Sequence, residues 1–363
     1  MKILLLAPAN SIHTIKWANA FSDRGHEVFL VSLPDHRADM DKLSPEVTVK
    51  YLSKGGGKGY YLSGGELKKY FREVKPDVVN AHYASGYGTL ARIAGVHPLV
   101  LNVWGSDIYE FPYKGKYQNI VIKRNLRNAD AVASTSNCMA EETRKVLKAP
   151  GMDITIVPFG VDVNRFRPYE DLKEKDHFLL GTVKLLSQNY GIDLLIRAFA
   201  LFKKRWEDVG CSGKPPKYFI CGRGPDREAL VSLVKELGLE KDVEIADYVP
   251  NEILAGVING FDVSCYASIQ ESFGVSVVES MACGVPVITT EADGFKEVSA
   301  EGETGFFVHS RDPQEFADRM WDLYVNEELR KEFGQNGRER VLRLYDWQKN
   351  VTVLEELLKK TSR

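Results

Sequence analysis

The sequence has little of what marks disulfide-bonded, metal-binding or membrane-spanning proteins. Its five cysteines show no paired spacing and no Cys-x-x-Cys, so neither a disulfide framework nor a zinc site is indicated. No apolar run approaches the roughly 18 residues that a membrane-spanning helix needs. No Gly-x-Gly-x-x-Gly is present, which disfavours a dinucleotide site in the first half of the chain. These absences favour a cytoplasmic protein with no metal site.

Length and composition predict two α/β domains. A chain of 363 residues is too long for one hydrophobic core, and its 44% hydrophobic and 27% charged residues are ordinary for a globular protein. The apolar run in Met1–Pro8 is short, and polar Asn10 and Ser11 follow closely. This start is therefore better explained as a first β-strand than as a signal peptide.

Charge is divided unevenly along the chain. Residues 1–165 carry 22 Lys and Arg against 16 Asp and Glu, whereas residues 166–363 carry 26 against 34. The basic first half should prefer anionic surfaces, either lipid or a phosphorylated acceptor. The alternative is that this excess only keeps the domain in solution. One expectation is therefore peripheral association with the inner face of the plasma membrane, and nucleic acid is not indicated.

The most informative stretch carries two acids, Glu271 and Glu279, eight positions apart. The apolar spacing between and after them predicts a helix over 275–283, and residues 287–290 then read as a buried parallel strand. Glu271 should lie in the loop before the helix and Glu279 on its second turn. Each acid can therefore take sugar hydroxyls on one side of the helix start.

The helix start between the acids is suited to a phosphate. Gly274 lets the chain turn sharply and leaves the backbone N–H groups of Val275 and Ser276 without a preceding helical turn. Such N–H groups, together with the helix dipole, attract anions.

The run Glu-Ser-Phe-Gly-Val-Ser-Val-Val-Glu, followed by Ser-Met-Ala-Cys-Gly-Val-Pro-Val-Ile, resembles the donor site of retaining nucleotide-sugar glycosyltransferases of family 4 (glycosyl transferases group 1). The resemblance implies the GT-B fold: two doubly wound Rossmann-like domains facing across a cleft, with a C-terminal helix that crosses back to the first domain. It implies that Glu271 contacts the transferred sugar and Glu279 the donor ribose. Phe273, Gly274, Val275 and Ser276 would line the diphosphate. The alternative is a helix that merely carries two acids.

The resemblance extends to other donor-side residues. Lys184 occupies the position of a cation that neutralises the donor diphosphate. A second cation is expected a few positions later, but Ser187–Tyr190 offers only polar residues, with Asn189 as a weak substitute and Arg223 as another candidate. Gly222 belongs with Arg223 to a glycine turn after a strand, and Tyr248 with Val249 would line the base.

The first half supplies candidates for the acceptor side. Asn10, Ser11 and His13 lie on the loop that follows the expected first strand, where functional residues of doubly wound domains gather. His13 could equally cap a helix or face solvent. His82 ends an expected strand and matches a histidine that the family points into the cleft.

Trp104 and Asp107 follow the next expected strand. Many relatives carry a histidine where Trp104 stands, so this chain departs from the family there. The indole could stack on a sugar or fill the core. Asp107 is the better polar candidate, and it joins Glu271, Lys184 and His82 in the expected catalytic set.

A glycine-rich segment, Gly55–Gly65, contains Tyr60 and Tyr61 and is flanked by lysines. It is predicted to lack regular structure. It is expected either to face a membrane or an acceptor or to be a plain surface loop. The expected domains are 1–167, which binds the acceptor, 168–345, which binds the donor, and 346–363, a helix that packs back on the first domain.

The resemblance therefore implies an enzyme that moves a sugar from a nucleotide diphosphate donor, a UDP-sugar, to a saccharide or lipid-linked acceptor with retained anomeric configuration. Polysaccharide or glycolipid assembly is the usual setting. No cofactor or metal is required, because Lys184 and the helix start would take a metal's part. The alternatives are a nucleotide-sugar epimerase on the same fold and a sugar-nucleotide-binding subunit without catalysis.

Overall fold

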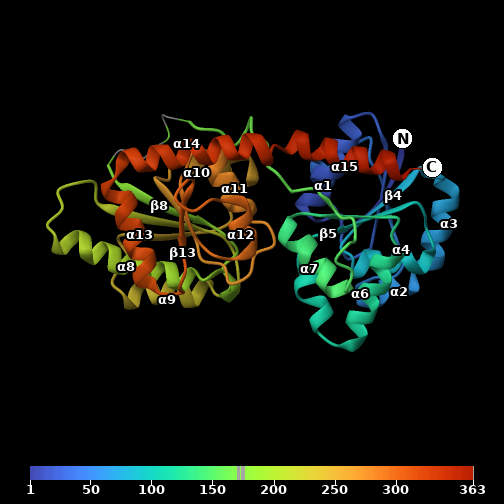
Figure 1. The fold of residues 1–363 in the computed structure, drawn as a ribbon, viewed down its shortest axis with the longest axis horizontal. Coiled ribbons are helices and arrows are strands. Elements are labelled where there is room, and N and C mark those ends of the chain that lie inside the picture. Colours follow the sequence, from blue (N-terminus) through green and yellow to red (C-terminus); the bar gives the residue numbers. More distant parts are fainter. Residues whose placement is uncertain (170–171, 173–175, 363) are drawn as a thin grey trace. The chain divides into compact units, whose positions relative to one another are not determined.

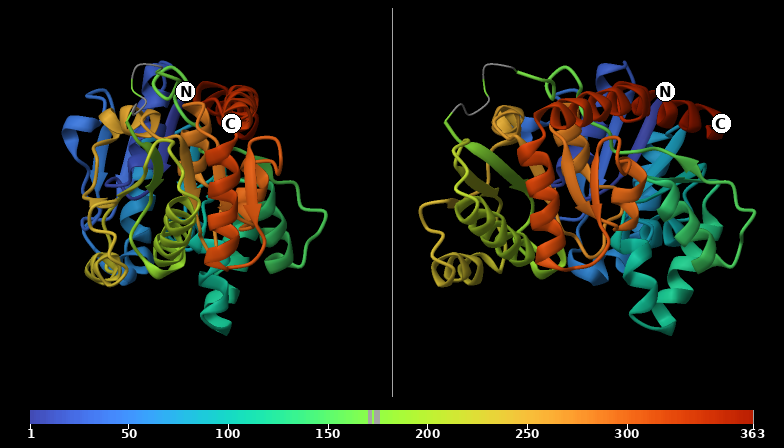
Figure 2. Two further views of the ribbon diagram at one scale, coloured as in Figure 1. Left: turned by 90° about the vertical axis from the view of Figure 1, so that its left-hand side faces the viewer. Right: turned by 60° about the vertical axis from the view of Figure 1, so that its left-hand side comes forward.

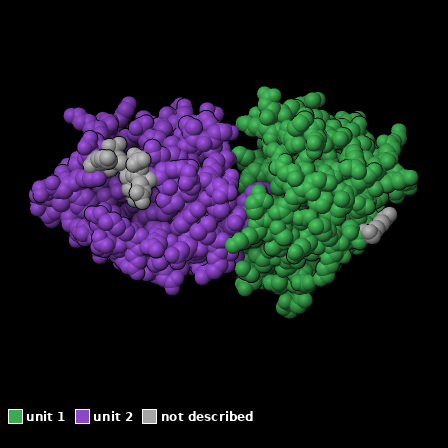
Figure 3. Space-filling view, turned by 90° about the horizontal axis from the view of Figure 1, so that it is seen from above, with its two compact units in different colours: residues 1–159, 348–363 green, residues 160–347 purple. Residues whose placement is uncertain are grey.

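The computed structural model describes residues 1–169, 172 and 176–362. The chain forms two compact units: unit 1 contains Met1–Phe159 and Gln348–Arg363, and unit 2 contains Gly160–Trp347 (Figure 3). The first division thus falls after Phe159, before the expected boundary at 167. The second falls after Trp347, just beyond the expected boundary at 345. Each unit is an α/β domain with its own core.

Unit 1 is built on a parallel sheet with the strand order β3-β2-β1-β4-β5-β6-β7. Its strands are β1 (Lys2–Leu6), β2 (Glu27–Ser32), β3 (Thr48–Tyr51), β4 (Val78–His82), β5 (Leu99–Val103), β6 (Ala131–Ser134) and β7 (Thr155–Ile156). Its helices are α1 (Ile12–Asp23), α2 (Gly56–Leu62), α3 (Gly64–Val74), α4 (Gly86–Ala94), α5 (Ser106–Tyr109), α6 (Lys116–Asn128), α7 (Asn137–Leu147) and α15 (Trp347–Thr361), with the 3₁₀ turns η1 (Met40–Lys42) and η2 (Phe111–Tyr113).

The strands of unit 1 are apolar because helices cover both faces of the sheet. Ile3 to Leu6 of β1 are fully buried, and β4 and β5 are buried throughout, which is the pattern of a doubly wound parallel sheet. Helices α1 and α15 lie on one face, and α4, α6 and α7 lie on the other (Figures 1 and 2). The strand order reverses between β1 and β4, and such a reversal opens a crevice at the carboxyl ends of the two strands.

Unit 2 repeats this architecture with the strand order β10-β9-β8-β11-β12-β13, all parallel. Its strands are β8 (Phe178–Val183), β9 (Pro216–Cys221), β10 (Val243–Ala246), β11 (Val263–Tyr266), β12 (Val287–Thr290) and β13 (Gly305–Val308). Its helices are α8 (Ile192–Asp208), α9 (Arg227–Glu236), α10 (Asn251–Asn259), α11 (Val275–Ala282), α12 (Asp293–Val298), α13 (Pro313–Val325) and α14 (Glu327–Leu344), with the 3₁₀ turn η4 (Gln188–Tyr190). Here the order reverses between β8 and β11. The doubly wound class predicted for each domain is confirmed.

The prediction that the glycine-rich segment lacks regular structure is wrong, because it forms α2 and the start of α3. Tertiary contacts outweigh the low helix propensity of glycine here. The Asp35 carboxylate accepts the Gly56 N–H at 3.1 Å. A Cβ on Gly59 would lie 2.5 Å from the Lys54 carbonyl oxygen, and one on Gly64 would lie 2.5 Å from Ile93. These glycines allow close packing that a side chain would prevent.

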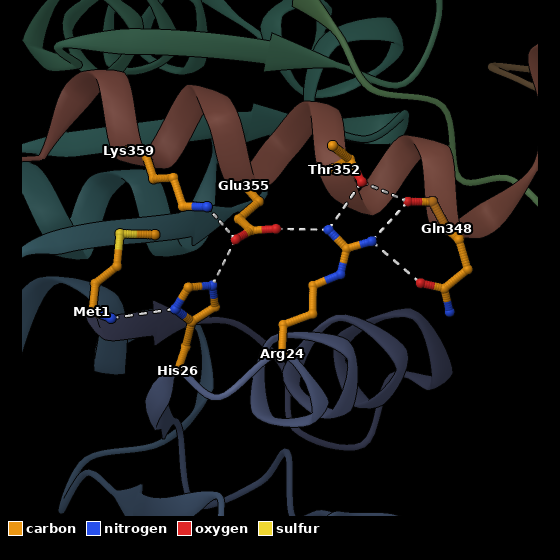
Figure 4. A network of polar contacts seen from close by, with 7 residues as sticks. All are labelled: Met1, Arg24, His26, Gln348, Thr352, Glu355 and Lys359. Atoms are coloured by element: carbon orange, nitrogen blue, oxygen red, sulfur yellow. Dashed lines mark hydrogen bonds and ion pairs between the residues drawn. The ribbon is translucent and has the colours of Figure 1, made fainter.

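The C-terminal helix α15 is held on unit 1, as expected, by a polar network centred on Glu355 (Figure 4). Arg24 donates to Glu355 Oε2 at 2.6 Å and to the Gln348 carbonyl oxygen at 2.9 Å. His26 Nε2 donates to Glu355 Oε1 at 3.1 Å, while its Nδ1 faces the N-terminal amine at 3.3 Å. Burial alone would raise the pKa of Glu355, but hydrogen bonds from Lys359, Arg24 and His26 lower it to about 2.

Candidate functional site

The strongest polar constellation of unit 2 lies where its strand order reverses. Lys184 directly follows β8, and Glu271 lies in the loop after β11. Lys184 Nζ donates to Glu271 Oε2 at 2.6 Å, and the two side chains are only 12% and 14% exposed. The ammonium group also lies 4.8 Å from the Tyr190 ring centroid and 5.8 Å from that of Phe295. The fold therefore brings together a cation and an acid that are 87 positions apart in the sequence.

The loop that carries Glu271 is fixed through its backbone. Asn189 accepts the Ile269 N–H at 2.7 Å with its carbonyl oxygen and donates to the Gln270 carbonyl oxygen at 3.1 Å with its side chain. The Glu271 carbonyl oxygen accepts the Gly294 N–H at 3.0 Å. Asn189 thus supports the loop of the acid and carries no charge with which to replace the second cation of the family.

Helix α11 begins as the sequence predicted. Gly274 has a φ of +100° and occupies the N-cap position, and a Cβ there would lie 2.9 Å from the Phe295 ring. Gly274 has no side chain that could cap this helix, so the first N–H groups, those of Val275 and Ser276, face the position where an anion can bind. Tyr266 of β11 fixes the helix by donating to the Ser276 carbonyl oxygen at 3.1 Å.

Glu279 lies on the second turn of α11 and is half-buried. Phe273, which was expected to line the diphosphate, is buried, with its ring edge-on to Tyr345 at 5.5 Å. The Phe273 side chain is therefore part of the core, and only its backbone can contribute to a site.

A second loop of unit 2 lies beside Lys184. A Cβ on Gly222 would lie 1.8 Å from the Lys184 carbonyl oxygen, so only glycine allows this approach. The Arg223 carbonyl oxygen accepts the Leu186 N–H at 2.8 Å. The Arg223 guanidinium lies 5.4 Å from the ring of Tyr248, which is exposed, and Val249 is half-buried next to it. Arg223 follows β9 as Lys184 follows β8, so both cations lie at the carboxyl ends of the strands.

In unit 1, three of the predicted residues form one aromatic cluster. The Trp104 ring lies 4.2 Å from His82 and 5.9 Å from His13, and His13 stacks on Phe159 at 4.2 Å. Burial lowers the pKa of His13 to about 4 and that of His82 to about 3, so both are neutral at neutral pH. Trp104 is 6% exposed and His82 is fully buried. The indole therefore fills the core of unit 1.

Asp107 is likewise enclosed. Its carboxylate accepts backbone N–H groups of Ala84 at 2.8 Å, Trp104 at 3.1 Å and Gly105 at 2.8 Å. Burial raises its pKa, and these hydrogen bonds oppose that rise. Through these hydrogen bonds Asp107 fixes the loop between β5 and α5. Asn10 is exposed on the loop after β1, and half-buried Ser11 precedes α1.

Two features were missed from the sequence. One is a cavity in unit 1 lined by aromatic side chains, and several of its lining residues lie in the loops that follow strands. The other is an Asp-x-Asp triplet, Asp39-Met40-Asp41, of the kind that some enzymes use to bind a metal. It lies at η1, with Asp39 paired to Lys42 at 3.2 Å. Within the described residues, no three His, Cys, Asp or Glu side chains are grouped as metal ligands.

The chain matches two family models. Residues 164–340 match glycosyl transferases group 1, and residues 2–136 match glycosyl transferase 4-like proteins. The chain is 27% identical over 360 residues to N-acetyl-α-D-glucosaminyl L-malate synthase of Bacillus anthracis, covering 93% of this chain and 90% of that protein. It is 31% identical over 296 residues to EpsD of Bacillus subtilis, which is named as a glycosyltransferase, covering 77% and 75%.

A solved structure supports the same assignment. HepE of Anabaena, in complex with UDP and glucose, matches with a TM-score of 0.78 at 19% identity, covering 99% of this chain and 100% of that one. At this identity the likeness establishes the GT-B fold alone. With the family matches, it defines a glycosyltransferase of the GT-B class. The chain belongs to the glycosyl transferases group 1, that is, to glycosyltransferase family 4.

None of the described helices has the length and hydrophobicity to cross a membrane.

Proposed function

We propose that this glycosyltransferase moves a hexose from a UDP-sugar to a saccharide or lipid-linked acceptor and retains the anomeric configuration. The observation that best supports this proposal is the ion pair between Lys184 and Glu271, whose Nζ and Oε2 atoms lie 2.6 Å apart. The pair lies where the strand order of unit 2 reverses, beside helix α11, which begins after Gly274. A cation and a helix start together suit a diphosphate, and a neighbouring acid suits sugar hydroxyls. HepE of Anabaena, solved with UDP and glucose, supports UDP as the nucleotide.

The proposed chemistry needs position and charge more than a nucleophile. The diphosphate gains negative charge as the glycosidic bond breaks, and Lys184 with the N–H groups of Val275 and Ser276 stabilises that charge. Before this step, when the donor binds, Lys184 exchanges Glu271 for a phosphate oxygen, which leaves the Glu271 carboxylate to accept hydrogen bonds from sugar hydroxyls. The acceptor hydroxyl attacks from the side of the departing phosphate, which takes its proton. Glu279 holds the ribose, and roles for His82 and Asp107 remain predictions.

UDP release in the presence of a chelator tests this proposal. Purified protein is incubated with UDP-hexoses and EDTA, with and without saccharide acceptors, and free UDP is measured. We expect acceptor-dependent UDP release that EDTA leaves unchanged, because protein groups supply the positive charge. An epimerase would interconvert donor sugars without releasing UDP, and a non-catalytic subunit would bind UDP without turnover.

We also propose that unit 1 associates peripherally with anionic membranes. Tyr117 and Ile120 of α6 are 60% and 50% exposed, and Lys116, Lys123 and Arg124 lie at helical spacing from them. Burial, and then the neighbouring Tyr117 hydroxyl, raise the pKa of Tyr61 to about 12, so the exposed end of α2 lies beside α6. Rings at the headgroup level and cations near it favour an anionic surface, each cation by about 1 kcal/mol.

The structure changes which residues can carry this association. Tyr60, which we had expected beside Tyr61 at the surface, packs inward: a Cβ on Gly86 would lie 2.7 Å from the Tyr60 ring. Tyr61 and Leu62 remain exposed. We therefore assign the membrane-facing surface to Leu62, Tyr117 and Ile120, with the cations of α6.

A further inference from the structure

A cavity of about 600 Å³ opens in unit 1 at the carboxyl ends of its central strands. Pro8 follows β1, His36 follows β2, Tyr83 follows β4 and Ser106 follows β5, and all four line the cavity. The strand order reverses between β1 and β4. The cavity therefore occupies the crevice where open α/β sheets bind ligands.

The walls of the cavity are aromatic and rigidly placed. The Tyr60 ring meets that of Tyr87 edge-on at 5.2 Å. The Tyr87 hydroxyl contacts Ser32 Oγ at 3.0 Å and His36 Nδ1 at 2.9 Å and accepts the Leu33 N–H at 3.3 Å. Because these partners fix Tyr87, it supports Tyr60.

Tyr83 adopts a left-handed backbone with a φ of +66°. This conformation costs of order 1–3 kcal/mol for a residue with a side chain, and such strain is concentrated at functional sites. Its ring lies 5.1 Å from that of Trp104 and is edge-on to it. The aromatic cluster beneath the cavity thus holds Tyr83 in a position that the backbone alone disfavours.

The chemistry of the lining suits a sugar ring. Tyr61, Tyr83 and Phe111 offer aromatic surface, while Ser85, Ser106 and the tyrosine hydroxyls offer hydrogen bonds. A pyranose presents C–H groups on its faces and hydroxyls around its edge, so it matches aromatic walls with polar groups between them. Burial, and then the charge of Asp35, raise the pKa of Tyr60 to about 12, so its hydroxyl stays neutral and able to donate.

The charge around the cavity disfavours anions. The described residues that line it include no Lys or Arg. Two of the charges that act on its tyrosines are acidic: Asp35 lies against Gly56 at 3.1 Å, and the charge of Asp107, after burial, raises the pKa of Tyr83. One is basic: Arg92 opposes the rise that burial causes in the pKa of Tyr61. The basic excess of unit 1 therefore supplies no Lys or Arg side chain to the described lining of this cavity. By contrast, the N-acetyl-α-D-glucosaminyl L-malate synthase of Bacillus anthracis is named for a product that contains malate, an anion.

We infer that this cavity binds an uncharged glycosyl unit, stacked between Tyr61 and Phe111, as the acceptor end of a saccharide. The inference rests on the proposed glycosyl transfer and adds the site and the charge class of the acceptor. Whether the saccharide is free or carried on a lipid, the unit that enters the cavity is uncharged.

Two glycines allow a matched test. Gly57 is the second residue of α2 and lines the cavity, whereas Gly65 is the second residue of α3 and lies outside its lining. Both are exposed, and a Cβ on either would have no atom within 4 Å. Gly57→Phe should therefore fill the cavity without disturbing the fold, and Gly65→Phe is the control for an added aromatic group on an exposed helix.

Binding is measured by NMR titration of the UDP-saturated protein with methyl glycosides of glucose, galactose, mannose and N-acetylglucosamine. Each is compared with its uronic acid or 6-phosphate counterpart. We expect at least one uncharged glycoside to bind about tenfold or more tightly than its anionic counterpart. We expect Gly57→Phe and Tyr61→Ala to weaken that binding at least about tenfold, and Gly65→Phe to leave it within about twofold.

Three results would overturn the inference: no uncharged glycoside binds, an anionic counterpart binds as tightly, or Gly57→Phe binds as the unchanged protein does. UDP affinity separates this failure from failure of the proposed function. If UDP binds normally and the glycosides do not respond to Gly57→Phe, only the acceptor site is wrong. If UDP does not bind at all, the donor assignment itself is wrong.

Discussion

Replacing Lys184 by methionine removes the ammonium group from the Glu271 carboxylate and keeps an unbranched side chain between Tyr190 and Phe295. In the unchanged protein this group lies 2.6 Å from Glu271 Oε2, and both side chains are almost buried. Two consequences follow. In the proposed mechanism the donor diphosphate loses its main cation, and the Glu271 carboxylate is left buried without its partner.

The loss of activity and the loss of stability differ in size and are measured by different assays. Loss of one charge stabiliser should lower kcat/KM by roughly 10² to 10³. Leaving one charge of a buried pair alone costs about 3 kcal/mol or more, which for a domain the size of unit 2 lowers Tm by roughly 6–12 °C. Calorimetric melting and UDP-release kinetics of Lys184→Met measure both effects on one preparation.

The double variant Lys184→Met with Glu271→Gln separates stability from catalysis. Because it removes both charges, stability should return to within about 1 kcal/mol of the unchanged protein, while kcat/KM stays at least about 10² below it. The reasoning is refuted if Lys184→Met keeps activity within a few-fold, or if the double variant recovers activity together with stability.

Three further predictions follow from the same geometry. Glu279→Ala should weaken UDP binding by roughly tenfold or more through the lost ribose contact. Glu271→Gln should leave UDP binding within a few-fold of the unchanged protein while turnover collapses. Equal losses of UDP affinity in calorimetry would remove the distinction between the two acids. Since the folded-state pKa of Glu355 lies at about 2 and that of His26 is also lowered, folded unit 1 binds fewer protons than the unfolded chain. The stabilisation of α15 should therefore be present above about pH 6.5 and be lost progressively as the pH falls toward about 2. Hydrogen exchange over 348–361, corrected for intrinsic rates, measures this stabilisation. If Glu355→Gln shows the same pH dependence as the unchanged protein, Glu355 does not have this role. Tyr117→Ser with Ile120→Ser should reduce sedimentation with anionic vesicles at low salt, while Val209→Ser with Ile253→Ser, which changes similarly exposed residues of unit 2, should not; an unchanged protein that stays in the supernatant would exclude membrane association.

Local patterns predicted the donor half well because its determinants are contiguous. The helix over 275–283 is observed as Val275–Ala282, and the strand over 287–290 is observed at those residues. Glycine followed by an apolar helical repeat specifies a turn and a helix without tertiary information. The pairing of Lys184 with Glu271 could not be derived in this way, since it depends on β8 and β11 being neighbours in the sheet.

The first half was harder because its determinants are tertiary. Gly55–Gly65 was predicted to be irregular from composition, but Asp35 and Gly86 supply contacts that fold it into helices. Trp104 could stack on a sugar or fill the core, and only the rings of His13, His82 and Phe159 around it decide for the core. The cavity escaped notice for the same reason, since its tyrosines and phenylalanine come from α2, α4, η2 and the loop after β4.

The central claim is retaining transfer from a UDP-sugar, and the most direct test is a donor screen with the product analysed by mass spectrometry and NMR. UDP-, GDP- and CMP-sugars are offered with the panel of uncharged and anionic glycosides. We predict that a UDP-hexose yields a product heavier than its acceptor by one hexosyl unit, with the anomeric configuration of the donor. An inverted product, or transfer from another nucleotide sugar but from no UDP-sugar, would contradict the account.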